Sequence, residues 1–303
     1  MAVNLTQIKD LLLPGLRGIE GKYEMIPSQY DKVFTKHDSK MAQERTAEMR
    51  FMGLAKLKGE GGQTEFDNNA GERFVYSQSH IEIGLGYAIT RKTIDDNLYK
   101  SQFQPSNLGL MESFAQTKEI YAANLLNTAT IYDANIGGDG VALCSTVHPI
   151  DGGVVANRPN TDVQLNEATL LNAMIGIRTN FRDQAGLKVF ARGRRLVIPP
   201  HLEPTAIRLL KTELRPGTAD NDTNAILSTS GGLKEDYQVM DFLTSQSAWF
   251  LLTNIDGLSY MERIKFETDM SVDFVTDNLL VKGYERYSFG YYNWRSIWGS
   301  FPV

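Results

Sequence analysis

Trp249-Phe250-Leu251-Leu252-Thr253 and the stretch Asp273–Gly290, DFVTDNLLVKGYERYSFG, place strand-forming sequence near the end of the chain. Eight aromatic residues lie between Val272 and Trp298, and this stretch has no cysteine or histidine. Aromatic and β-branched side chains suit pleated, half-buried strands. Without a thiol or an imidazole, the stretch offers no obvious nucleophile or transition-metal ligand. It therefore predicts packing and contact surface rather than catalysis.

The composition is that of an ordinary globular protein, with 303 residues, 42% hydrophobic and 22% charged. A net charge of −5 argues against a dedicated nucleic-acid binder, which usually has a basic face. Cys144 is the single cysteine, so no intrachain disulfide can form. We find no signal-peptide pattern and no apolar run long enough to span a bilayer, and we therefore expect a cytoplasmic protein.

The sequence of the N-terminal third predicts an extended arm followed by a projecting two-stranded hairpin. Residues 1–58 are interrupted by glycine and proline, with a predicted helix over Gln43–Leu57. From Ile81 to Ile89 apolar residues alternate with small or polar ones, which indicates a strand with one apolar face. Phe74 and Tyr76 begin a similar alternation, so residues 59–92 are predicted to form a two-stranded projection. An isolated hairpin is marginal in water, and we expect this one to lean on a neighbouring molecule.

The middle of the chain predicts helices and one short buried strand. A long helix is expected to run from a cap at Ser106 to about Thr130, with Leu110, Phe114, Tyr121 and Leu125 on one stripe. A second is expected over Asn166–Gln184, with Leu170, Met174, Ile177 and Phe181 on one side and Gly186 terminating it. Leu196-Val197-Ile198 suits a buried strand, and Pro204 suits the first turn of a helix to about Leu214. The fold class is α+β, without regular βαβ alternation.

Cys144 and His148, four residues apart, suggest a thiol nucleophile with its base, and hence a cysteine hydrolase. Known cysteine hydrolases bring this pair together from distant segments, and Pro149 would break a helix between the two. We favour a buried cysteine and a loop histidine. His37, His80 and His201 show no metal-ligand spacing. We therefore predict no catalytic, cofactor-binding or metal-binding residues.

The densest basic segment runs from Lys188 to Arg195 and carries Arg192, Arg194 and Arg195. Arg178 and Arg182 lie just before it. Such a cluster could meet nucleic acid electrostatically. We favour an inter-subunit salt-bridge patch facing the acidic excess elsewhere on the chain.

The order of these elements resembles the major capsid (head) protein of tailed bacteriophages, particularly the Mu-like head-subunit group. The resemblance covers nearly the whole chain. It is carried by Leu196–Leu202 (LVIPPHL) with the helix through Ala206 and Leu209-Leu210, by Trp249–Leu252, by Asp273–Gly290 and by the Cys144–Pro159 segment. It rests on the order and lengths of elements, since none of these segments is diagnostic by itself.

The resemblance implies an α+β tailed-phage major capsid protein fold. In it, residues 1–58 would be the N-terminal arm and 59–92 the projecting β-hairpin loop. Residues 93–186 and 256–290 would form a peripheral domain with a long spine helix, and 187–255 and 291–303 an axial domain. The implied function is a non-enzymatic virion protein, assembling in the host bacterial cytoplasm into hexamers and pentamers of an icosahedral head around double-stranded DNA. A non-viral nanocompartment shell with the same fold remains an alternative.

The resemblance also bears on partners. Some members of this family join subunits through a Lys–Asn isopeptide bond, with the lysine on the projecting loop. Residues 59–91 contain no lysine, so we expect no such cross-link. The arm is too short to contain a long scaffolding segment, so we expect a separate scaffold protein, together with portal and decoration proteins. We also expect weak, non-specific contact with packaged DNA and no contact with a membrane. The candidate subunit contacts are Phe66, Phe74, Tyr76, Arg178, Arg182, Arg192, Arg194, Arg195, Trp294 and Trp298.

Overall fold

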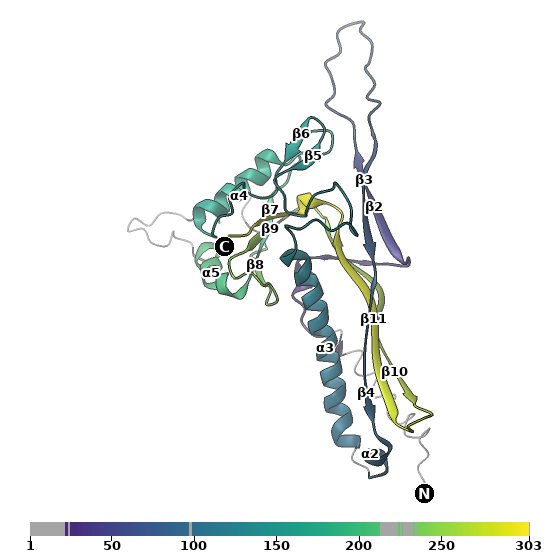
Figure 1. Cartoon of the computed structure of the whole chain (residues 1–303). Helices are drawn as coiled ribbons and strands as arrows, with labels where there is room; N and C mark the ends of the chain where they lie inside the picture. Colours follow the sequence, from purple (N-terminus) through teal and green to yellow (C-terminus); the bar gives the residue numbers. More distant parts are fainter. Residues whose placement is uncertain are drawn as a thin grey trace.

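The computed structural model describes residues 22–23, 25–96, 99–212, 224, 226, 233 and 235–302, with backbone alone at 99–102 and 104. Two four-stranded sheets, a long helix and a projecting hairpin make up most of it (Figure 1). The α+β class predicted from the sequence is confirmed.

The first sheet has the strand order β1-β10-β11-β4. Its long central strands β10 (Leu258–Val272) and β11 (Leu279–Tyr291) are antiparallel, which confirms the strands expected in the C-terminal stretch. Strand β4 (Ile81–Ile89) pairs antiparallel with β11, and the short β1 (Thr35–Asp38) runs parallel to β10. One side of β4 contributes Ile83, Tyr87 and Ile89 to the core, as the alternation predicted, whereas Leu85 of the same predicted face is exposed.

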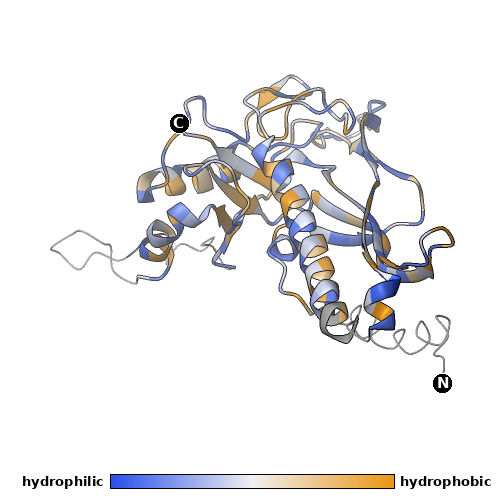
Figure 2. Cartoon of the chain, turned by 60° about the horizontal axis from the view of Figure 1, so that its bottom comes forward, coloured by the Kyte–Doolittle hydropathy of each residue, from blue (hydrophilic) through white to orange (hydrophobic). Residues whose placement is uncertain are grey.

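Helix α3 (Tyr99–Asn127) lies along one face of this sheet (Figure 1). Its predicted start at Ser106 was wrong, because the helix continues through Pro105 and begins about two turns earlier, at Tyr99. Apolar and polar residues alternate along the length of α3 (Figure 2). Leu110 and Phe114 are buried as predicted, whereas Tyr121 is exposed. The buried stripe instead continues through Lys118, Ala122 and Leu126, at intervals of four residues.

The second sheet has the order β12-β9-β7-β8. Its strands are β7 (Gly193–Ile198), β8 (Tyr237–Val239), β9 (Trp249–Thr253) and β12 (Ile297–Ser300), and every residue of β9 and β12 is buried. Helix α4 (Glu167–Asn180) begins with a capping box between Asn166 and Thr169. It ends at Asn180, earlier than predicted, because Phe181 adopts an extended conformation; Gly186 lies in the following turn.

Helix α5 (Glu203–Leu210) follows the short 3₁₀ turn η2 (Pro200–Leu202), with Pro204 in its first turn as predicted. Residues 213 and 214 of the predicted helix lie outside the described residues. Apolar side chains of α4 and α5 share one core with β7 and β9.

The projecting hairpin consists of β2 (Gln43–Arg50) and β3 (Gly71–Ser79) with the loop 51–70 between them (Figure 1). The helix predicted over Gln43–Leu57 was therefore wrong. Residues such as Gln43, Glu44 and Ala47 favour helix locally, but pairing with β3 satisfies the backbone and overrides that preference. The predicted pairing of the strand at Phe74 with β4 was also wrong. A single residue, His80, separates β3 from β4, which leaves no room for a turn, and each strand joins a different sheet.

The remaining elements are short. They are η1 (Tyr30–Lys32), α2 (Arg91–Asp95), the two-stranded β5 (His148–Ile150) and β6 (Gly153–Val155), and η3 (Trp294–Ser296). The turn between β5 and β6 is Asp151-Gly152, where Gly152 has a φ of 80° that favours glycine.

Candidate assembly surfaces and the buried polar junction

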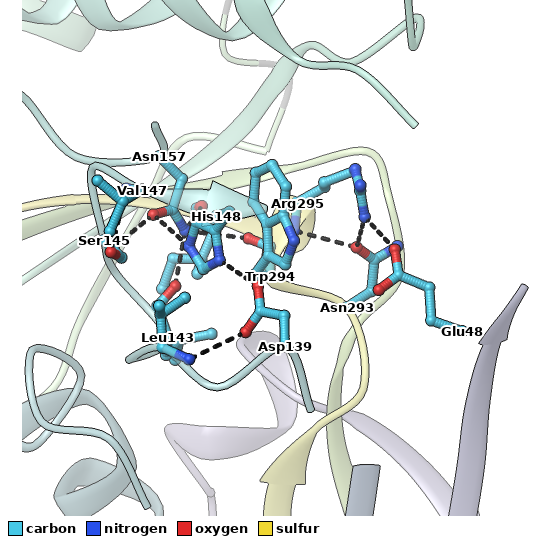
Figure 3. Close-up of polar contacts among 12 residues, drawn as sticks. Glu48, Asp139, Leu143, Ser145, Val147, His148, Asn157, Asn293, Trp294 and Arg295 are labelled. Atoms are coloured by element: carbon cyan, nitrogen blue, oxygen red, sulfur yellow. Dashed lines mark hydrogen bonds and ion pairs between the residues drawn. The ribbon is translucent and has the colours of Figure 1, made fainter. Parts of the chain in front are cut away.

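His148 lies in a buried polar junction between the two sheets rather than in a catalytic site (Figure 3). Its Nδ1 is 2.6 Å from Asp139 Oδ2, and its Nε2 is 3.1 Å from Asn157 Oδ1. The amide nitrogen of Asn157 donates to three backbone carbonyls, those of Leu143, Trp294 and Ile297. The amide oxygen of Asn157 then faces Nε2 of His148.

Cys144 is not activated by this histidine. The thiol is buried, and burial raises its pKa from 9.0 to about 12. Both nitrogens of His148 are already hydrogen-bonded to Asp139 and Asn157, so neither serves as a base for the thiol. The hydrolase alternative lacks the nucleophile–base pair that its chemistry requires. Buried cysteine, the interpretation we favoured, is what the structure contains.

The described residues contain no group of three or more His, Cys, Asp or Glu side chains arranged to hold a metal ion. Within the same part of the chain, no helix is both long and apolar enough to cross a bilayer.

The tip of the projecting hairpin carries the densest exposed apolar surface. Its exposed large apolar side chains are Phe51, Met52, Leu54, Leu57 and Phe66, and Phe66 is 85% exposed. Monomeric proteins rarely expose so many apolar side chains together unless they bind something. A second exposed pair, Phe274 and Val275, lies at the turn between β10 and β11.

The other aromatic residues that were predicted to contact a neighbouring subunit lie inside this subunit or are half-buried in it. Tyr76 is buried and packs edge-on against Tyr291, while Phe74 is half-buried against the core. Gly138, with a φ of 88°, lies so close to the Tyr76 ring that a Cβ there would be 2.2 Å from it. Trp294 is fully buried, and Trp298 packs on Trp249 with ring centroids 4.9 Å apart.

The basic segment is partly neutralised within the subunit. Arg194 and Arg195 both pair with Glu235, each at 2.9 Å. Arg182 donates to the Gly186 carbonyl at 3.3 Å. Arg178 and Arg192 are exposed. The five arginines therefore do not form one uniform surface.

Two charged pairs in the core were not anticipated from the sequence. Lys118 of α3 binds Glu285 of β11 at 2.7 Å, with side chains only 5% and 0% exposed. The Tyr23 hydroxyl donates to the same carboxylate at 3.1 Å. Burial raises the pKa of Glu285, and Lys118 opposes that shift.

The second buried pair joins Arg295 of η3 to Glu48 of β2 at 2.5 Å (Figure 3). Both pairs join segments more than 160 residues apart, and no local spacing marks them.

Comparison with known proteins identifies the family. The model of a family described as "Phage capsid protein" matches residues 79–299, more than two thirds of the chain. No curated protein matches the chain. Many solved structures are similar to this chain; the three that follow have low sequence identity, so they show the fold alone.

The first is the procapsid of bacteriophage JBD30, with TM-score 0.51, 17% identity, and coverage of 99% of this chain and 77% of that one. The second is a virus-like particle from Pyrococcus furiosus, with TM-score 0.54, 9% identity, and coverage of 94% and 97%. The third is the capsid of a native GTA particle, with TM-score 0.57, 10% identity, and coverage of 92% of both chains. The fold is thus the tailed-phage major capsid protein fold, and the chain belongs to the phage capsid protein family, as a structural and non-enzymatic capsid subunit.

Proposed function

We propose that this chain closes into hexamers and pentamers of an icosahedral head that encloses double-stranded DNA, and that it assembles in the cytoplasm of a bacterial host. The observation that carries the proposal is the exposed apolar tip of the projecting hairpin, on a subunit whose own core is complete without it. Extended elements that overlap neighbours provide large areas, and obligate interfaces often bury more than about 2,000 Å².

We propose the domain boundaries given above for this role. The first sheet with α3 supports a peripheral domain built from residues 93–186 and 256–290, and the second sheet supports an axial domain at 187–255 and 291–303. The packing of α4 on the second sheet favours including this helix in the axial domain. The pairing of β2 with β3 favours a projecting loop that starts near Gln43 rather than at residue 59.

We assign the chain to the Mu-like head-subunit group on the order of its elements and the strand–proline–helix module at Leu196–Leu210. Separate scaffold, portal and decoration proteins, and weak contact with DNA, belong to the same proposal. The low net charge of −5 suits a wall against which packaged DNA stays mobile.

Electron microscopy of the purified protein, alone and after co-expression with the scaffold gene, tests the proposal. We expect closed shells or capsomers, with DNA in particles from infected cells. Shells that never contain DNA would favour a nanocompartment, a function suggested by the fold shared with the Pyrococcus furiosus virus-like particle. A protein that stays monomeric under every condition would contradict both.

Replacing both Leu57 and Phe66 by serine should abolish shells while leaving a folded subunit, because it removes apolar contact area from the exposed tip. Gln63→Ser, in the same loop, is the matched control and should leave assembly unchanged. Normal shells from the double variant would contradict a contact role for the tip.

A further inference from the structure

The base of the projecting hairpin is held by one carboxylate that belongs to a different part of the fold. Asp151, in the turn between β5 and β6, forms ion pairs with Arg50 at the end of β2 and with Arg73 near the start of β3. Both arginines therefore reach the same carboxylate from opposite strands of the hairpin.

This contact lies where the ladder between the two strands ends. Arg50 pairs with Gly71 as the last residue pair of the β2–β3 ladder. Beyond it, residues 51–70 form the loop that carries the exposed apolar tip. Within the described chain, the hydrogen bonds and ion pairs of this loop join it to itself or to Arg50, as in the contacts of Asp67 with the Gly53 and Asn69 amides. The direction of the loop is thus set at its base.

Asp151 is itself fixed to the body of the subunit. Its turn is closed by pairing of Ile150 with Gly153, and its backbone amide donates to the Gln184 carbonyl at 3.2 Å. The stem of the hairpin has a second attachment on its other end. The Ser77 amide of β3 donates to the Ile136 carbonyl at 2.7 Å, and the Gly138 amide donates to the Val75 carbonyl of β3 at 2.9 Å, so β3 is joined to the loop after α3. The Glu48–Arg295 ion pair also holds the stem, and the Asp151 contact is the attachment nearest to the loop.

We propose that Asp151 is a positioning residue for assembly, which fixes the angle at which the hairpin presents its tip to a second copy of this chain. This inference rests on the proposed function for its purpose, but the geometry it describes belongs to the single subunit. An extended chain spans about 3.3 Å per residue, so the tip lies up to roughly 30 Å from the last ladder pair. At that length, a tilt of about 10° at the base displaces the tip by about 5 Å, more than a contact surface tolerates.

The contact controls orientation more than stability. The side chains of Arg50, Arg73 and Asp151 are 12%, 30% and 35% exposed, so water screens them in part. Partly exposed ion pairs contribute little to the free energy of unfolding. Loss of the Asp151 charge should therefore change the angle of the hairpin without unfolding the subunit.

Pulsed electron–electron double resonance on the full chain measures the angle directly. Spin labels are attached at Gln63→Cys in the loop and Asn172→Cys on the exposed side of α4. Cys144 is buried and stays unlabelled. Labelled protein is diluted into an excess of unlabelled protein, so that the measured distance is within one subunit. Asp151→Asn removes the charge while keeping the shape, and Asp151→Glu keeps the charge.

Glu65→Gln is the matched control, because it breaks the exposed Lys56–Glu65 ion pair in the same loop without touching the base. We expect Asp151→Asn to widen the distance distribution at least twofold and to lower the yield of closed shells. Asp151→Glu and Glu65→Gln should both keep the narrow distribution.

An Asp151→Asn distribution as narrow as that of Glu65→Gln would overturn the inference. The proposed function fails separately, if the unmodified chain forms no shells while Asp151→Asn still widens the distribution. A widened distribution with an unchanged yield of regular shells would show that assembly does not depend on this angle, and would also overturn the positioning role.

Discussion

The imidazole of His148 lies stacked on the indole of Trp294, with ring centroids 4.1 Å apart and an angle of 6° between the planes. The Arg295 guanidinium lies 4.2 Å from the same indole and pairs with Glu48 of the hairpin. The segment after α3, the C-terminal turn η3 and the stem of the projecting hairpin therefore meet at one buried junction. This junction holds parts of the chain together that the two sheets alone would not connect.

Asn157→Ala should destabilise the subunit by about 2–4 kcal/mol, because it removes the buried hydrogen bonds of this amide to three backbone carbonyls and to Nε2 of His148. Chemical denaturation measures this loss. Asn172→Ala, at an exposed position of α4, is the control and should stay within about 0.5 kcal/mol of the unmodified chain. Equal stability of the two variants would contradict the structural importance of the Asn157 amide.

Cys144 should not react with thiol reagents at neutral pH while the subunit is folded, because burial raises its pKa to about 12 and excludes the reagent. Unfolding should expose it fully. Phe66→Cys, at the exposed tip, supplies a thiol that should react at once. Cys144→Ala should still assemble. Rapid labelling of the folded, unmodified chain would show that the thiol is accessible.

Gly283→Ala should cost about 1–3 kcal/mol by overpacking the core between the first sheet and α3. A Cβ at this position would lie 2.9 Å from the rings of both Phe114 and Phe266. Gly84→Ala is the matched control on the neighbouring strand, where the nearest atom to a Cβ is 4.0 Å away. The difference between the two melting temperatures measures the effect, and no difference would mean that α3 shifts without cost.

Glu285→Gln should destabilise the subunit by about 3–5 kcal/mol, since it leaves the buried Lys118 ammonium without its counter-charge. The double variant Lys118→Met, Glu285→Leu should recover much of that loss, because it removes both buried charges together. Lys282→Ala, which breaks an exposed pair with Asp269, is the control and should cost less than about 1 kcal/mol. Additive losses in the double variant would argue against coupling between Lys118 and Glu285.

The Asp151 contact should be insensitive to mild acid. Hydrogen bonds from Arg50, then from Arg73, lower the pKa of the Asp151 carboxyl below its ordinary value of 3.8. A carboxyl with a lowered folded-state pKa contributes stability that is present above its unfolded pKa and is lost as the pH falls through the folded one. The distance distribution of the spin-labelled chain should therefore be the same at about pH 7 and about pH 5. Widening between these two values would mean that another group controls the hairpin.

The sequence by itself determined the elements whose side chains alternate or recur with a clear period. Strand β4 could be predicted because its apolar residues recur every second position, and α4 because its apolar residues recur at spacings of three and four. The start of α5 could be predicted from Pro204. The sequence also showed that the stretch from Val272 to Trp298 contains neither a thiol nor an imidazole. These features are local, so the identity of neighbouring residues is enough to specify them.

Only the tertiary structure decided which strands pair and which charges meet. Strand β2 has helix-favouring residues and becomes a strand because β3 completes its hydrogen bonds. Arg50, Arg73 and Asp151 come together across some eighty to one hundred residues, as do Lys118 and Glu285 across a still longer separation. Such contacts depend on how whole sheets pack, and that packing is a property of the folded chain rather than of any segment within it.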